Sequence, residues 1–292
     1  MEKNKWHIFP GSTWFFPLAA TLVYILGLVL AMESGKVLNP VTFFCGLAIL
    51  IAFVVLDKVN NYTTSSSVNL FSTVGRTQKL KHPSVIALLF AAFAAIFLSI
   101  FFLLQQQVLI GVNLAWLVLI AGLMTINFSR VGRIWAQPFQ WLIEGLLVSP
   151  LMLFWGASLQ GFPPVPLMSL LSIGLILLYA VVTLALQYPD YQSDMEHSHR
   201  SFILLVGWEK GIVIHNLLLI LSFLLLGAYI YLGGTWRFHW AVVVMLLVGA
   251  FQILQLRRIS QGLRPNWGLL KSTAMLLFSA VVYFFITGYL LK

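Results

Sequence analysis

The sequence is dominated by apolar runs that are each close to the length that crosses a lipid bilayer. A transmembrane helix needs about 20 predominantly apolar residues. Only 9% of the 292 residues are charged, whereas soluble domains have about 25%. We therefore expect an all-α, multi-pass membrane protein in which residues 1–292 form a single bundle of nine transmembrane helices. The nine runs fall at roughly 13–31, 40–56, 84–104, 108–127, 138–157, 165–187, 211–232, 236–255 and 267–290.

The distribution of cations predicts which way the bundle is oriented. If the N-terminus is cytoplasmic, 14 of the 17 Lys and Arg residues fall in segments on that face, and Lys36, Arg237 and Lys292 remain outside. Lys and Arg are concentrated in cytoplasmic loops, so this split predicts a cytoplasmic N-terminus and, with nine spans, an external C-terminus. In a bacterium the membrane would be the inner (cytoplasmic) membrane. The net charge of +9 then reflects topology and contact with anionic lipids, and we expect no nucleic-acid partner.

Two connections, 57–83 and 188–210, are longer and more polar than the others. They follow the second and sixth runs, so the predicted topology puts both on the cytoplasmic face. We expect these two loops to cap the functional site. Cys45 is the single cysteine and lies inside an apolar run, which excludes a disulfide within the chain and a thiolate metal site.

The loop 188–210 contains the most informative polar pattern. Asp190 and Asp194 are four residues apart, so on a helical turn both carboxylates point to one side. Two such carboxylates can bind one Mg²⁺ ion. With Glu196 they account for three of the eight acidic residues in the chain. The alternative is a solvated loop whose acids offset nearby cations.

This stretch resembles a known family. The segment DYQSDMEHSHRSFILLVG resembles the second aspartate motif of the UbiA superfamily of intramembrane aromatic prenyltransferases. The segment SRVGRIWAQPFQWLIEGLLVSPLMLFWGASLQG is similar to the region around the fourth and fifth helices in the branch that prenylates 1,4-dihydroxy-2-naphthoate for menaquinone. The resemblance implies a nine-helix membrane enzyme that transfers a polyprenyl group from its diphosphate to an aromatic quinone precursor. It also implies that Asp190 and Asp194 hold Mg²⁺ and that Arg200 assists them.

The first aspartate motif of the family, NDxxDxxxD, is altered in this chain. Asn60 and Asn61 stand at its start, and Thr64 takes the place of the second aspartate. A shifted alignment makes Asp57 the first aspartate, followed by Asn60 and Thr64. Neutral oxygens can coordinate Mg²⁺ but supply no compensating charge. At an effective dielectric near 20, a unit charge about 4 Å away contributes roughly 4 kcal/mol before desolvation. We therefore expect one weakly held Mg²⁺ ion.

Cationic side chains on the cytoplasmic face are candidates for binding the diphosphate. The resemblance places Arg76 best among them, and His199 stands where the family usually has Lys. Charge-assisted hydrogen bonds would hold the phosphate oxygens. The alternative is simple positive-inside bias. The remaining candidates are Lys79, Lys81, Arg130 and Arg133.

Glu144 lies near the middle of the run 138–157. An acid there costs at least roughly 2.5 kcal/mol unless it is paired, neutral or facing a wet cavity. The resemblance puts an acid at the position of Gln137, seven residues earlier on the same helix face, so both residues are candidates for substrate binding. The alternative is a protonated glutamate that hydrogen-bonds to a neighbouring helix. We expect Asn113, His215 and Asn216 to link helices.

Three functions remain after these observations. The first is a divergent prenyltransferase. The second is a non-catalytic UbiA-like protein that binds a quinone, pigment or isoprenoid, or that acts as a subunit of a larger membrane complex. The third, a transporter or channel, is disfavoured because Glu144 is the one charged residue expected near the middle of a run, whereas a transporter should show broken helices or several such charges.

Overall fold

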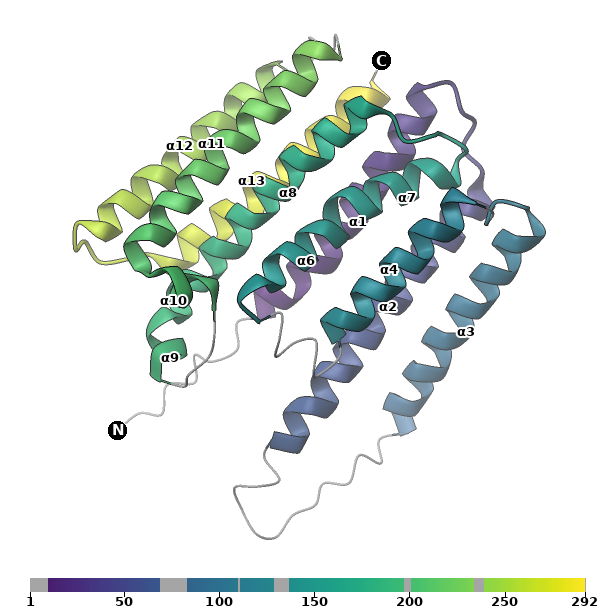
Figure 1. Cartoon of the computed structure of the whole chain (residues 1–292), viewed down its shortest axis with the longest axis horizontal. Coiled ribbons are helices and arrows are strands. Elements are labelled where there is room, and N and C mark those ends of the chain that lie inside the picture. The colour runs from purple at the N-terminus through teal and green to yellow at the C-terminus, as the bar shows by residue number, and fades with distance from the viewer. Residues whose placement is uncertain are drawn as a thin grey trace.

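The computed structural model describes residues 10–68, 83–109, 111–128, 137–196, 201–233 and 239–291, and the regular elements within them are all helices. The long helices lie side by side in one bundle (Figure 1). They are α1 (Pro10–Glu33), α2 (Pro40–Val68), α3 (Pro83–Gln105), α4 (Val112–Phe128), α8 (Pro166–Gln187), α11 (Trp208–Leu232), α12 (His239–Ser260) and α13 (Trp267–Leu290), together with a composite helix. The composite helix is formed by α6 (Gln140–Leu146), the π-helical turn η3 (Leu147–Leu151) and α7 (Met152–Leu159).

Seven of the described helices are long and apolar enough to cross a membrane. Two shorter apolar helical segments, Pro40–Leu56 and Val112–Ile126, lie where the second and fourth spans are expected. The prediction of an all-α, multi-pass membrane protein is confirmed, and the chain is an integral membrane protein.

The two segments predicted as polar loops are largely helical where the structure describes them. Helix α2 continues to Val68, so residues 57–68 extend a helix beyond its apolar part. Extending an existing helix avoids the cost of nucleation, which lets residues of modest helix propensity follow on. In the second segment, η4 (Tyr188–Asp190), α9 (Tyr191–Glu196) and α10 (Phe202–Val206) precede α11, which begins at Trp208.

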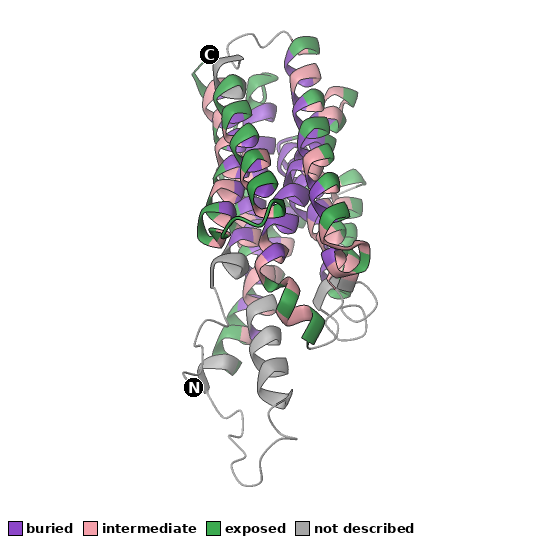
Figure 2. Ribbon diagram, turned by 90° about the vertical axis from the view of Figure 1, so that its left-hand side faces the viewer, coloured by how far each residue is buried: buried purple, intermediate pink, exposed green. Residues whose placement is uncertain are grey.

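Buried residues concentrate in the middle of the bundle, and exposed residues cover its outside (Figure 2). Helix α8 is central, because it packs against α11, α13, α6 and η3. About 67% of its spanning window is buried, against 17% for α3 and 22% for α12. Phe90, Phe93 and Phe97 on α3 are exposed, as suits a helix whose outer face meets lipid tails.

Small residues allow α1 and α7 to approach closely. A Cβ atom added at Gly27 would overlap the carbonyl oxygen of Leu153, and one added at Gly156 would overlap that of Tyr24. Close backbone approach through small residues is how transmembrane helices gain packing energy without a hydrophobic drive between them. Replacing either glycine would separate the two helices.

Serine hydroxyls fix the neighbours of α8 to its backbone. Ser149 Oγ, within the π-helical turn, donates to the carbonyl oxygen of Ser172 at 2.9 Å. Ser222 Oγ on α11 donates to that of Gly174 at 2.9 Å. The same turn contains Pro150, which lacks a backbone N–H. These bonds join the composite helix and α11 to the half of α8 that lies nearer its start at Pro166.

Consecutive long helices alternate in direction, so their ends form two opposite faces (Figure 1). One face contains α9, the start of α1, the starts of α11 and α13, and the ends of α2 and α8. We call it the α9 end. The other face contains the ends of α1, α11 and α13, and we call it the opposite end.

Candidate functional site

The acidic turn directly continues the central helix. Asp190 is the last residue of η4 and is exposed, whereas Asp194 lies in α9 and is half-buried. The backbone runs from α8 through η4 into α9 without a break in helical structure. On such a path, residues four apart lie on one side. The spacing therefore places Asp190 and Asp194 on one side of the helical extension of α8.

Aromatic side chains fix this turn to the bundle. The ring of Trp208 at the start of α11 lies 5.0 Å from the ring of Tyr188 and 5.5 Å from that of Tyr191. Trp208 also lies 5.9 Å from Trp267 at the start of α13. Edge-to-face ring pairs of this kind stabilise by about 0.5–1.5 kcal/mol each beyond area burial. They set the direction in which α9 leaves α8.

The short helix α10 connects the acidic turn with the start of the composite helix. The backbone N–H of Ile203 donates to Gln187 Oε1 at 3.4 Å. Its neighbour Phe202 lies 6.4 Å from Phe139 and 5.4 Å from Trp141, measured between ring centroids. The start of α6 is therefore held near α9 by a hydrophobic contact.

Glu144 makes two hydrogen bonds that fix its carboxylate. Gln140 Nε2 donates to Glu144 Oε1 at 2.9 Å, and Tyr179 Oη on α8 donates to Glu144 Oε2 at 3.2 Å. The Tyr179 ring in turn stacks on Phe15 of α1 at 5.8 Å. The alternative to substrate binding at this position is a glutamate that hydrogen-bonds to a neighbouring helix. The hydrogen bond from Tyr179 on α8 is such a contact.

Glu144 lies closer to one end of its apolar helical segment than to the middle. The segment is Gln140–Leu159, so Glu144 lies about 6 Å from its α9 end at 1.5 Å per residue. An acid near the end of a span costs less to bury than one at the middle. Gln137 begins the 3₁₀ turn η2 (Gln137–Phe139), so the α-helical spacing that put it on the face of Glu144 does not hold.

Most of the other predicted site residues lie outside the described part of the chain. The backbone of Asn60, Asn61 and Thr64 is in the last turns of α2, but their side chains, like that of Gln137, are outside the description. Their assigned roles stay predictions. The residues wholly outside the described ranges are Arg76, Lys79, Lys81, Arg130, Arg133, His199 and Arg200.

The described donors suit a Mg²⁺ ion that is completed by a ligand. Within the described ranges, no group of three or more His, Cys, Asp and Glu side chains comes together. Mg²⁺ commonly uses one or two protein carboxylates, several waters and the phosphates of a substrate. Asp190 and Asp194 fit that pattern. They do not fit a metal held by protein ligands alone.

Tyr188 and His215 were not singled out as site residues by the sequence. Tyr188 Oη and His215 Nε2 are buried and have no hydrogen-bond partner in the described part of the molecule. The Tyr188 hydroxyl faces α11, where a Cβ at Gly211 would lie 3.3 Å from it. Tyr188 thus positions the turn before Asp190. One tyrosine in an aromatic-rich chain gives no sequence signal for this role.

The predicted links between helices have different outcomes. Asn113 Nδ2 donates to the carbonyl oxygen of Ser158 at 3.3 Å and so joins α4 to α7, as expected. His215 Nδ1 lies 3.3 Å from Oδ1 of the adjacent Asn216. This contact stays within α11.

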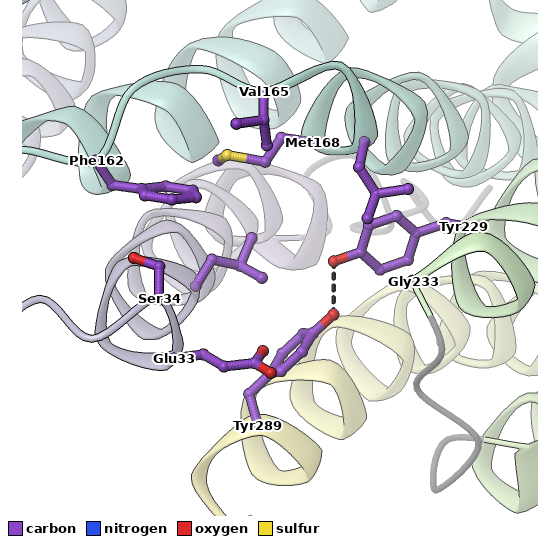
Figure 3. A pocket seen from close by; sticks show the side chains of 10 residues that line it. Glu33, Ser34, Phe162, Val165, Met168, Tyr229, Gly233 and Tyr289 are labelled. Atoms are coloured by element: carbon purple, nitrogen blue, oxygen red, sulfur yellow. Dashed lines mark hydrogen bonds between the residues drawn. The ribbon is translucent and has the colours of Figure 1, made fainter.

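A pocket at the opposite end contains none of the predicted site residues. It has a volume of about 240 Å³ and is formed where α1, α8, α11 and α13 meet (Figure 3). Tyr229 Oη and Tyr289 Oη share a hydrogen bond of 2.5 Å across it. Glu33, Phe162 and Met168 complete much of its wall. No local motif marked these distant residues in the sequence.

The fold and the acidic turn define an integral membrane helical bundle with a polar face at one end. The sequence matches no protein-family model and no curated protein. The structure is similar to the apo structure of a UbiA homolog from Aeropyrum pernix K1, with a TM-score of 0.61 and 16% sequence identity over 97% of this chain and 98% of that one. The chain therefore has a UbiA-like fold, which confirms the resemblance at the level of fold.

Proposed function

We propose that the chain is a divergent membrane prenyltransferase that moves a polyprenyl group from its diphosphate to an aromatic quinone precursor, such as a dihydroxynaphthoate. The observation that carries this proposal is the acidic helical turn of Asp190 and Asp194 at the α9 end of a UbiA-like fold. The proposal includes nine spans and a cytoplasmic α9 end, in line with the positive-inside distribution.

The acidic turn would hold the metal. A Mg²⁺ ion on Asp190 and Asp194 would supply positive charge against the leaving diphosphate. In the transfer, the bond between prenyl C1 and the diphosphate oxygen breaks, and the diphosphate leaves with the electron pair. C1 then forms a bond to a carbon of the aromatic ring, which loses its proton. Arg76 and Arg200 are proposed to bind the phosphate oxygens.

The end of α2 is proposed to contribute neutral ligands. Asn60, Asn61 and Thr64 would contact the diphosphate through amide and hydroxyl groups without adding negative charge, so one metal ion would be held weakly. Glu144 and Gln137, near the start of α6, are proposed to contact the aromatic acceptor. The hydrogen bond from Tyr179 orients the Glu144 carboxylate for this purpose.

The test is a transfer assay with the purified full chain in detergent. Labelled prenyl diphosphates of several chain lengths are mixed with dihydroxynaphthoate and Mg²⁺, and we expect a metal-dependent prenylated product. Asp190→Asn and Asp194→Asn should lose it. Glu196→Gln is the matched control, because Glu196 is an exposed acid of the same helix that hydrogen-bonds to Gln192 at 3.5 Å. An equal loss in the control, or no product with any donor, contradicts the proposal.

A second candidate function is non-catalytic binding of a quinone, pigment or isoprenoid, alone or within a larger membrane complex. Two observations favour it. Asn and Thr stand in the first aspartate motif in place of acids, and the pocket at the opposite end combines apolar residues such as Phe162 and Met168 with the hydroxyls of Tyr229 and Tyr289. Mass spectrometry of the purified protein separates the two functions. A bound diphosphate with Mg²⁺ favours the enzyme, whereas a quinone, a pigment or partner subunits favour this alternative.

A further inference from the structure

One face of α12 ends in a cationic pocket that the proposed function does not use. Along α12, this face carries residues at helical positions i, i+3, i+4, i+7 and i+8. They are Phe251, Leu254, Gln255, Arg258 and Ile259, and all five line the pocket. Arg257, the neighbour of Arg258 in sequence, is not part of the lining, because successive helical residues point about 100° apart.

The loop to α13 and the start of that helix complete the pocket. Leu263, Arg264, Asn266 and Leu269 line its other side, and the volume is about 300 Å³. Ligand pockets in proteins commonly measure about 300–1,000 Å³. The pocket belongs to the α9 end, because α13 begins there and Trp267 packs on Trp208.

The polar side chains of the pocket fall into two groups. The amides serve the fold: Asn266 Oδ1 accepts from the backbone N–H of Leu269 at 3.1 Å, and Gln255 Oε1 accepts from Thr273 Oγ1 at 3.5 Å. The two arginines, Arg258 and Arg264, have no such role in holding the described part of the fold together. Arg258 and Arg264 are exposed, and neither forms an ion pair with a carboxylate in the described chain. Two guanidinium groups thus flank a cavity with no described counter-charge.

The apolar residues of the pocket face the lipid side. Phe251 is 42% exposed, Leu254 52% and Leu269 40%. Phe251 and Leu254 lie one to two turns further into the span than Arg258. A molecule that satisfied the whole surface would place an anionic group between the arginines and hydrocarbon chains along α12.

We infer that this pocket binds the phosphate headgroup of an anionic phospholipid. Arg258 and Arg264 bind the phosphate oxygens through charge-assisted hydrogen bonds. Phe251, Leu254 and Leu269 contact the acyl chains. A basic pocket between transmembrane helices at the membrane surface suits this class of lipid. The site contains no carboxylate, so binding needs no divalent cation, which distinguishes it from the diphosphate site proposed at Asp190 and Asp194.

The test measures binding of fluorescently labelled phosphatidylglycerol to the full chain in neutral detergent, where no charged bilayer surface is present. We expect saturable binding in the presence of EDTA, and at least tenfold weaker binding of labelled phosphatidylcholine. Arg258→Gln and Arg264→Gln should each weaken binding of phosphatidylglycerol by about fivefold or more, from the usual contribution of one cation near an anionic lipid. Arg258→Lys should retain part of the affinity.

Arg257→Gln is the matched control, since it removes an equal charge from the same helical turn outside the pocket. It should change the affinity less than twofold. An equal loss of affinity in Arg257→Gln would mean that general attraction to the basic surface, and not this pocket, binds the lipid. That result would overturn the inference. So would a requirement for Mg²⁺, or equally tight binding of inorganic phosphate or of the deacylated headgroup. Each variant is checked for the wild-type thermal unfolding profile, and failure of this experiment leaves the transferase proposal untouched.

Discussion

Helices α2 and α8 both continue in helical structure beyond their apolar residues, but the two extensions have different polar side chains. Both helices continue past their apolar parts at the α9 end, α2 to Val68 and α8 through η4 into α9. The α8 extension carries Asp190 and Asp194 and is held by aromatic contacts. The α2 extension carries Asn60, Asn61 and Thr64 in the matching region. The proposed two-sided site therefore has two acids on the α8 extension and the single acid Asp57 on the α2 extension.

The comparison would fail most clearly if the ends of α2 and α8 were found on different sides of the membrane. Single cysteines at Ser66 and Ser198, introduced in a Cys45→Ala background, should both react with an impermeant reagent from the cytoplasmic side only. The reason is that both segments follow spans that run in the same direction. Reaction of the two cysteines from different faces would end the two-sided site, and reaction of both from the external face would reverse the predicted orientation.

The next largest effect is expected from removing charge at each end separately. Asp190→Asn or Asp194→Asn should weaken Mn²⁺ binding at least tenfold, since a charge about 4 Å from a cation contributes roughly 4 kcal/mol before desolvation at a dielectric near 20. Asp57→Asn on α2 should change the affinity less than twofold. Paramagnetic titration with Mn²⁺ measures both. An equal loss at Asp57 would show that the α2 end still supplies a ligand.

Restoring charge at the α2 end should have a smaller effect in the opposite direction. Asn61→Asp combined with Thr64→Asp should tighten Mn²⁺ severalfold and raise prenyl transfer, and His199→Lys should add to the gain. The changes lie in the polar extension of α2, so they should lower stability little compared with a mid-membrane acid. If metal affinity rises but no prenylated product forms with any chain length or acceptor, the binding function replaces the enzyme.

The smallest effect is expected between the two ends, at the hydrogen bond from Tyr179 to Glu144. Tyr179→Phe removes that donor and should lower the free energy of unfolding by about 0.5–1.5 kcal/mol. Mn²⁺ affinity should stay at the wild-type value, because Glu144 is not a proposed metal ligand. Thermal unfolding and the same titration test this. A large loss of metal binding would instead connect Glu144 with the acidic turn.

The limits of the apolar spans could be predicted closely because they depend on residues that are neighbours in the sequence. The expected runs 165–187 and 267–290 correspond to helices Pro166–Gln187 and Trp267–Leu290. The extensions 57–68 and 191–196 were predicted as loops, because a polar helix beyond the membrane has no apolar periodicity to reveal it. Hydropathy predicts where the apolar part of a helix ends. Helix α2 and the helical path from α8 through α9 both continue beyond that point.

The site was predictable where its members are neighbours in sequence. Asp190 and Asp194 are recognisable from their spacing alone. The partner of Glu144 was not, because Tyr179 is 35 residues away and any of several helices could have supplied it. The pocket around Arg258 depends on how α12 and its loop pack, which the sequence does not specify.

The contact of α1 with α7 through Gly27 and Gly156 also constrains the order of assembly. A chain grows at about 5–20 residues per second, so α1 is synthesised roughly 6–25 seconds before its glycine partner on α7. Helix α13, which also packs on α1, arrives later still. During that interval Gly27 lacks the backbone of Leu153 as its neighbour. Helix α1 is therefore among the last of the described helices to acquire its final neighbours, and a ribosome that stops early leaves it without them.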